Sequence, residues 1–91
     1  MTRTPEQVAA DDALADAITA AQLAHHGTAE GVLTTYVVVA KRQWWDEQGG
    51  RYVAYYRNLR DDDVPLDEQL GLLEYAATRV RKLIAADEEA N

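Results

Sequence analysis

The feature that most constrains the fold of this chain is a pair of β-branched and aromatic segments separated by adjacent glycines. The first segment, residues 36–39, reads Tyr-Val-Val-Val, and the second, residues 51–57, contains three tyrosines and a valine. Such side chains fit a pleated strand and lose rotamer freedom in a helix. Gly49 and Gly50 supply the positive-φ positions that a tight reversal needs. Residues 32–59 are therefore expected to form a β-hairpin.

The turn leaves two strand registers open. If Gln48 and Gly49 form a two-residue turn, Trp45 lies opposite Tyr52. A loop one residue longer or shorter brings Trp44 to the face of Tyr52 instead, because a one-residue slip moves a strand's whole side-chain set to the other face. An isolated two-stranded ribbon is marginal in water. At least one face is therefore expected to be covered, by the flanking helices or by a second copy of the chain.

A first helix is expected over residues 4–26. Thr4 is suited to the N-cap and Pro5 to the first helical position, and Gln7 completes a capping box. Gly27 is a natural C-terminal stop. The helix is rich in alanine, so close packing with modest burial is expected, with its aspartates (Asp11, Asp12 and Asp16) facing mainly outward.

A longer second helix is expected over residues 64–88, with Pro65 near its first position and residues 89–91 as a frayed tail. Its apolar residues recur at spacings of 4-3-4-3-4, the strongest periodic signal in the chain: Leu66, Leu70, Leu73, Ala77, Val80 and Ile84. This stripe is expected to pack on the hairpin and the first helix. This helix would be about 36 Å long, which is longer than is required to cover a two-stranded ribbon of this size. The C-terminal half of the helix is therefore expected to meet a second subunit.

These elements predict one small α+β domain over residues 1–91. Its order is helix–β-hairpin–helix, with a two-stranded antiparallel ribbon packed on a long C-terminal helix. The net charge of −7 opposes non-specific binding to nucleic acid or to an anionic membrane. The absence of cysteine fits a reducing cytoplasm, and the longest apolar segment is too short to span a membrane, so no membrane partner is expected.

The hairpin differs in charge from the rest of the chain. Residues 41–60 contain five basic and two acidic side chains, a local charge of +3. One interpretation is a solvated hairpin with interspersed charges. The other is a basic, aromatic tip that docks on an acidic partner or on the acidic helices of another subunit.

The sequence contains no Gly-rich phosphate loop, nucleophile elbow or metal-ligand cluster. His25 and His26 are adjacent, so they lie about 100° apart on a helix and do not form an i,i+4 ligand pair. Neither catalytic residues, nor a metal, nor a cofactor is expected, and the protein is expected not to be an enzyme.

Four features lie within residues 31–85: the segment 32–40, a Gly-containing turn, an Asp-rich loop with Val64-Pro65, and residues 71–76 running into 79–81. Together they resemble a group of small, uncharacterised proteins encoded by mycobacteriophages and related actinobacterial phages. The resemblance covers roughly residues 31–85. It implies a phage origin and a place in the host cytoplasm, and it carries no site residues to this chain.

The expected function is that of a non-catalytic phage accessory protein that binds a host or phage protein and modulates it, and a homodimer is expected. The expected partner-binding residues are Trp44, Trp45, Arg51, Tyr52 and Tyr55, since Trp, Tyr and Arg dominate binding hot spots. The alternative is a nucleic-acid-directed regulator. It would bind DNA or RNA through the Arg/Tyr hairpin, or act as an acidic DNA mimic that blocks a DNA-binding protein.

Overall fold

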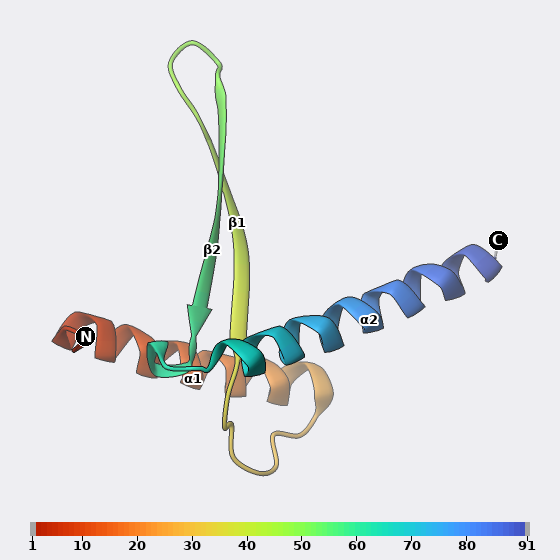
Figure 1. The fold of residues 1–91 in the computed structure, drawn as a ribbon, viewed down its shortest axis with the longest axis horizontal. Helices are drawn as coiled ribbons and strands as arrows, with labels where there is room; N and C mark the ends of the chain where they lie inside the picture. The colour runs from red at the N-terminus through yellow and green to blue at the C-terminus, as the bar shows by residue number, and fades with distance from the viewer. Residues whose placement is uncertain (1, 91) are drawn as a thin grey trace.

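The computed structural model of the protein describes residues 2–90 and shows two helices joined through a β-hairpin (Figure 1). The elements in chain order are α1 (Pro5–His26), β1 (Val37–Trp45), β2 (Arg51–Leu59), a 3₁₀ turn η1 (Arg60–Asp62) and α2 (Leu66–Ala90). β1 and β2 pair antiparallel in a two-stranded sheet. The predicted helix–hairpin–helix order and α+β class are confirmed.

Helix α1 begins and ends with the predicted caps. The Thr4 hydroxyl accepts a hydrogen bond from the Gln7 backbone N–H at 3.1 Å, and the Gln7 side chain accepts one from the Thr4 N–H at 2.8 Å. At the other end Gly27 takes a left-handed conformation with φ of 77°, and its N–H donates to the Leu23 carbonyl. Both helix signals in the sequence are therefore confirmed.

The hairpin is shorter at its start than expected. β1 begins at Val37 rather than at residue 32, and residues 27–36 form an irregular connection that curves below the helices (Figure 1). The strand register places Trp44 opposite Tyr52 and Trp45 opposite Arg51. Of the two registers left open by the sequence, the one with Trp44 on the face of Tyr52 is therefore the correct one.

The turn explains this register. The Asp46 N–H donates to the Gly50 carbonyl at 3.0 Å, and the Gly49 N–H donates to the Asp46 carbonyl at 3.2 Å. Gly49 has a φ of 81°, a conformation that other residues adopt only with strain. The loop is thus one residue longer than a two-residue turn, which shifts the pairing by one position.

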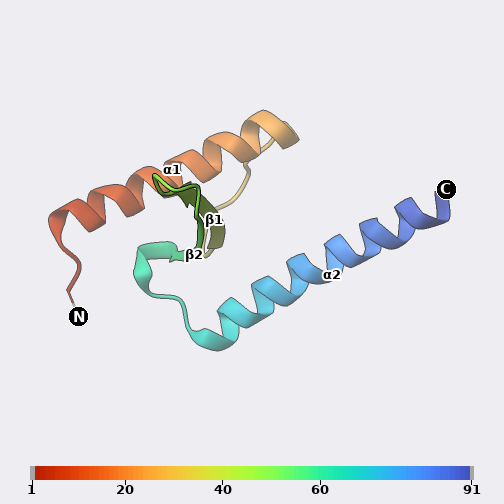
Figure 2. The same cartoon turned by 90° about the horizontal axis from the view of Figure 1, so that it is seen from above.

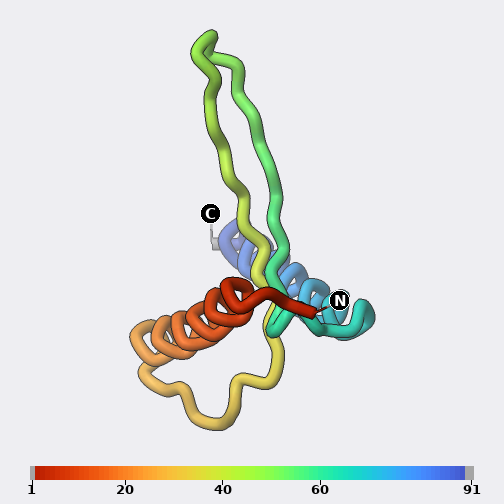
Figure 3. Tube along the Cα trace, turned by 90° about the vertical axis from the view of Figure 1, so that its left-hand side faces the viewer, coloured from red at the N-terminus to blue at the C-terminus, as the bar shows by residue number. Residues whose placement is uncertain are grey.

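The three long elements extend in different directions from one junction. The hairpin rises away from both helices in Figures 1 and 3, and Figure 2 shows α1 and α2 on opposite sides of its base. The radius of gyration is 16.9 Å, against about 12 Å for a compact domain of this length. The molecule is an open scaffold.

Among the described residues, the buried side chains are few. Tyr36, just before β1, is 7% exposed, and Val64 and Gln69 are buried beside the start of α2. The Gln69 side-chain amide donates to the Val64 carbonyl at 2.6 Å, which fixes the chain as it enters α2. These three residues are a very small core for the described chain, and the hairpin and α2 project from this region (Figure 1).

The expected burial of the α2 stripe is wrong. Leu66, Leu70, Leu73, Val80 and Ile84 are all exposed. The reason is geometric: α2 meets β1 near the junction and then runs away from the rest of the molecule (Figure 2). The helix also continues to Ala90, so residues 89 and 90 of the expected frayed tail are helical, while residue 91 lies outside the described residues.

A second correction concerns Asp11, which the sequence placed on the outer face of α1. Asp11 is half-buried, and its carboxylate lies 2.7 Å from the Arg3 guanidinium, which also lies 3.4 Å from Asp61 in η1. The hydrogen bond to Asp11, supported by the charge of Asp61, raises the pKa of Arg3. Arg3 thus links the start of α1 to the turn that follows β2.

Candidate interaction site at the hairpin tip

The register distributes the five predicted binding residues over both faces of the hairpin. Side chains of a strand alternate between faces, and directly opposed residues share one. Trp44 and Tyr52 therefore lie on one face, together with Tyr56. The other face holds Lys41, Trp45, Arg51, Tyr55 and Arg57, and we call these five residues the basic face.

Trp44 and Tyr52 form a preorganised aromatic pair. Their ring centroids lie 5.8 Å apart with an interplanar angle of 14°, a stacked arrangement. Such pairs contribute about 0.5–1.5 kcal/mol beyond the burial of their area. Both rings nevertheless remain close to half exposed, so the outer side of the pair is available to a partner.

The Asp46 carboxylate links the turn backbone to the Tyr52 side chain through hydrogen bonds. One carboxylate oxygen accepts hydrogen bonds from the backbone N–H groups of Gln48 and Gly50, at 2.9 and 2.7 Å. The other accepts one from the Tyr52 hydroxyl at 3.0 Å. The hydrogen bond from Gly50, followed by that from Tyr52, lowers the pKa of Asp46.

Sequence reasoning missed this role of Asp46. The signal was present, because aspartate at the first position of a turn that ends in glycine commonly accepts hydrogen bonds from backbone N–H groups two to four residues on. The bond from Tyr52 could not be foreseen, since it depends on the register that the sequence left open.

On the basic face, both aromatic side chains are largely exposed. Trp45 is 63% exposed and lies opposite Arg51, while Tyr55 is 70% exposed and lies opposite Lys41. Within the part of the chain that the structure describes, neither ring stacks on another ring. This face therefore presents three cations and two large amphipathic rings to solvent.

The arrangement suits recognition of a protein surface. Tyr and Trp supply large contact areas with few rotatable bonds, and arginine adds a planar, multidentate donor. The positive charge of the basic face complements an acidic surface, whereas the aromatic pair on the other face adds apolar area. A hairpin that stands free of its own helices can insert between elements of a partner.

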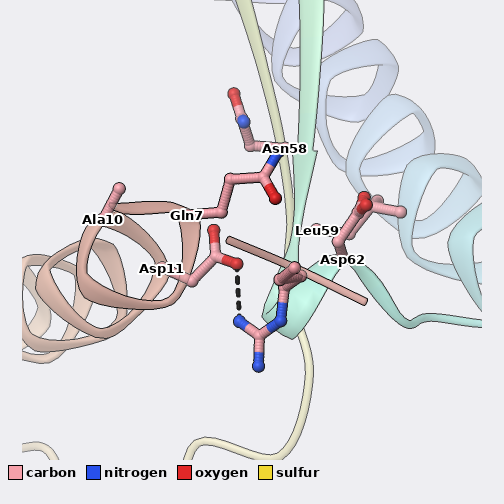
Figure 4. Close-up of a pocket in the computed structure, with 7 residues that line it drawn as sticks. Gln7, Ala10, Asp11, Asn58, Leu59 and Asp62 are labelled. Atoms are coloured by element: carbon pink, nitrogen blue, oxygen red, sulfur yellow. Dashed lines mark hydrogen bonds and ion pairs between the residues drawn. The ribbon is translucent and has the colours of Figure 1, made fainter. Parts of the chain in front are cut away.

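Away from the hairpin tip, a hollow lies between α1 and the end of β2 (Figure 4). Gln7, Ala10, Asp11, Asn58, Leu59 and Asp62 line it together with Arg3. The guanidinium of Arg3 is already engaged by Asp11, as the dashed line in Figure 4 marks. Two of its lining residues, Arg3 and Asp11, therefore take part in the attachment of η1 to α1.

Residues 2–90 show neither a metal-binding cluster nor a helix that could span a membrane. No group of three or more His, Cys, Asp and Glu side chains is placed there to hold a metal ion. His25 and His26 lie exposed in the last turn of α1. None of the helices in this range combines the length and apolar character that crossing a bilayer would require.

Comparison of the chain with protein-family models, curated proteins and solved structures finds no match. The assignment of the site consequently depends on the geometry of this chain alone. The resemblance of residues 31–85 to actinobacterial phage proteins stays a prediction.

Proposed function

We propose that this protein is a non-catalytic protein that binds a partner protein through the tip of its hairpin and modulates the activity of that partner. The observation that carries the proposal is the exposure of Trp44, Trp45, Tyr52 and Tyr55 on a hairpin that projects from both helices (Figure 1). Large exposed apolar patches on a protein surface commonly mark interaction sites.

The biological setting follows from the phage resemblance. Within this proposal the protein is an accessory protein of a phage that infects an actinobacterium, and it acts in the host cytoplasm on a host or phage protein. Its small size and the absence of catalytic motifs from its sequence suit an effector that works by occupying a surface.

The basic face narrows the chemistry of the partner. Lys41, Arg51 and Arg57 lie in a row along one face, with Trp45 and Tyr55 among them. Electrostatic complementarity mainly raises association rate and specificity, whereas buried aromatic anchors supply affinity. The partner surface should therefore be acidic around an apolar depression that accepts Trp45.

The test is partner capture by single-residue variants. The wild-type protein is used to capture its partner from a mycobacterial host lysate, and the affinity for the purified partner is then measured for Trp45→Ala and Arg51→Ala. Hot-spot truncation costs about 2 kcal/mol or more, so each variant should bind at least about thirtyfold more weakly.

Gln43→Ala provides the matched control, because Gln43 is exposed on the same face as Trp45 but carries no ring or charge. It should bind as the wild type does. Equal binding by all three variants, each with an unchanged circular dichroism spectrum, would show that the tip is not the binding site.

A second candidate function is nucleic-acid binding through the same face. The observation that favours it is the alignment of three cations with Tyr55 and Trp45, which could contact phosphates and stack bases. The net charge of −7 opposes it, because such affinity depends on phosphate neutralisation.

Retention on single- or double-stranded DNA at low ionic strength, lost as salt is raised, would favour nucleic-acid binding. Flow-through would favour the protein partner.

The acidic form of this alternative, a DNA mimic, predicts a different result. The protein would then release a host DNA-binding protein from its DNA, and Trp45→Ala would leave that release unchanged, since the acidic surface lies on the helices.

A further inference from the structure

Helix α2 presents an apolar stripe that the described part of the chain leaves largely uncovered. Leu70 is 59% exposed and Val80 54% exposed, and Leu66, Leu73 and Ile84 are exposed on the same side. Beyond its first turns the helix runs away from the junction (Figures 1 and 2). A helix of 25 residues is stable in water chiefly through the packing of such a face.

The spacing of the stripe specifies the kind of element that covers it. The 4-3-4-3-4 pattern repeats every seven residues, which is the spacing of a coiled-coil seam, and Ala76 and Leu83 widen this seam on one side. The small Ala77 lies near the middle of the stripe and permits close approach of another helix. The occupant is therefore a helix that runs along the whole length of α2.

The exposed surface of the chain is large enough for an obligate dimer. It amounts to 7772 Å² for a mass of 10.1 kDa, whereas a compact monomer of that mass exposes about 5,300 Å². The excess is about 2,500 Å² per chain. If each of the two copies buried half of its excess surface, the interface would bury about 2,500 Å² in total, which is within the range of permanent homodimers.

We infer that α2 pairs with α2 of a second copy of this chain in an antiparallel coiled coil. In this alignment Leu66 lies opposite Ile84 of the partner subunit, and Leu70 lies opposite Val80 of the partner subunit. Leu73 lies opposite Ala77 of the partner subunit. By two-fold symmetry every residue of the stripe then has an apolar counterpart.

Over residues 66–84, charge favours the antiparallel orientation. The first turn of α2 carries Asp67 and Glu68, and Arg81 and Lys82 follow about four turns later. The antiparallel alignment places these acids beside Arg81 and Lys82 of the partner subunit. A parallel alignment places like charges and like helix ends together, which costs free energy.

The mass in solution tests the pairing. Sedimentation equilibrium of the full chain should give twice 10.1 kDa. Val80→Glu should give the monomer mass, because it puts a charge in the seam. Tyr75→Glu is the matched control, since Tyr75 is exposed on the opposite side of α2, and it should stay dimeric.

A monomer mass for the wild type at millimolar concentration would overturn the inference, and so would a dimer that survives Val80→Glu. The wild-type mass decides the question even if Val80→Glu does not fold. These outcomes are independent of partner capture by the tip, whose variants leave α2 unchanged.

Cysteine pairing tests the orientation, because the native chain has no cysteine. Leu66→Cys and Ile84→Cys, prepared separately, refolded together and mildly oxidised, should form a mixed disulfide dimer. Each variant alone should cross-link little, since in the antiparallel coil its two cysteines lie about 27 Å apart along the axis. Efficient disulfide dimers of each variant alone, without the mixed product, would overturn the antiparallel arrangement.

Discussion

At the scale of single residues, Asp46 determines the shape of the hairpin tip. Its carboxylate accepts three hydrogen bonds, two from the turn backbone and one from Tyr52, although the residue is exposed. Gly50 supplies the shortest of them at 2.7 Å. A Cβ at Gly50 would lie 2.7 Å from a carboxylate oxygen of Asp46, so the glycine leaves room for that bond.

The turn should therefore respond to acid. The pKa of Asp46 is lowered, so its stabilisation of the turn is fully present above the ordinary aspartate pKa and is lost as the pH falls through the lower, folded-state pKa. In an NMR titration the Gln48 and Gly50 amide shifts should move with a midpoint below the ordinary value. Tyr52→Phe should raise the midpoint, and Asp46→Asn should abolish the transition. A midpoint at or above the ordinary aspartate value would contradict this account of the turn.

Tyr36 allows a second test, because its hydroxyl is buried without a hydrogen-bond partner in the described part of the chain. Burial is the main cause that raises its pKa. Tyr36→Phe removes the unsatisfied group and should leave the free energy of unfolding unchanged or raise it by about 1 kcal/mol. Tyr36→Ala should lower it by about 3–5 kcal/mol. Urea denaturation measures both, and a clear loss of stability in Tyr36→Phe would show that the hydroxyl is bonded after all.

At the scale of elements, the two adjacent tryptophans have different roles. Trp44 stacks on Tyr52, whereas Trp45 lies on the other face without a ring partner among the described residues. Trp44→Ala should destabilise the hairpin by about 0.5–1.5 kcal/mol, whereas Trp45→Ala should change it by less than about 0.5 kcal/mol. Hydrogen exchange of the hairpin amides measures the difference. Equal acceleration in both variants would refute the division of roles.

The sequence predicted those elements whose signals are local. Thr4, Gln7 and Gly27 act through neighbours three or four residues away, so the ends of α1 followed from their identity. The strand register depended on whether Gln48 and Gly49 form a two-residue turn or the loop is one residue longer or shorter. The composition of the loop is compatible with these alternatives. The burial of the α2 stripe could not be predicted, because periodicity shows that a helix has an apolar face but not which element covers it.

The same limit applies to the candidate site. Its residue types were visible in the sequence, but their division between two faces follows from the register alone. The surroundings of Asp11 could not be predicted either. Its position on α1 suggested solvent exposure, but Arg3 in the N-terminal segment forms an ion pair with it.

At the scale of the whole molecule, the chain places two apolar surfaces on two projecting elements. The hairpin tip is assigned to a partner protein and the α2 stripe to a second copy, and the small core around Tyr36 joins them. Pairing through α2 would add the apolar burial that the isolated chain lacks. The hairpin would then extend from a dimer whose tips remain free.

This separation can be measured directly, because both tryptophans of the chain lie at the hairpin tip and its intrinsic fluorescence reports on that region alone. Acrylamide quenching of the free protein, at a concentration where it is dimeric, tests whether the tip is open. The account predicts red-shifted emission that is readily quenched, and protection from quenching when the partner protein is added. Blue-shifted emission that resists quenching in the free dimer would show that the tips are covered by the second copy, and would contradict the claim that they are the binding surface.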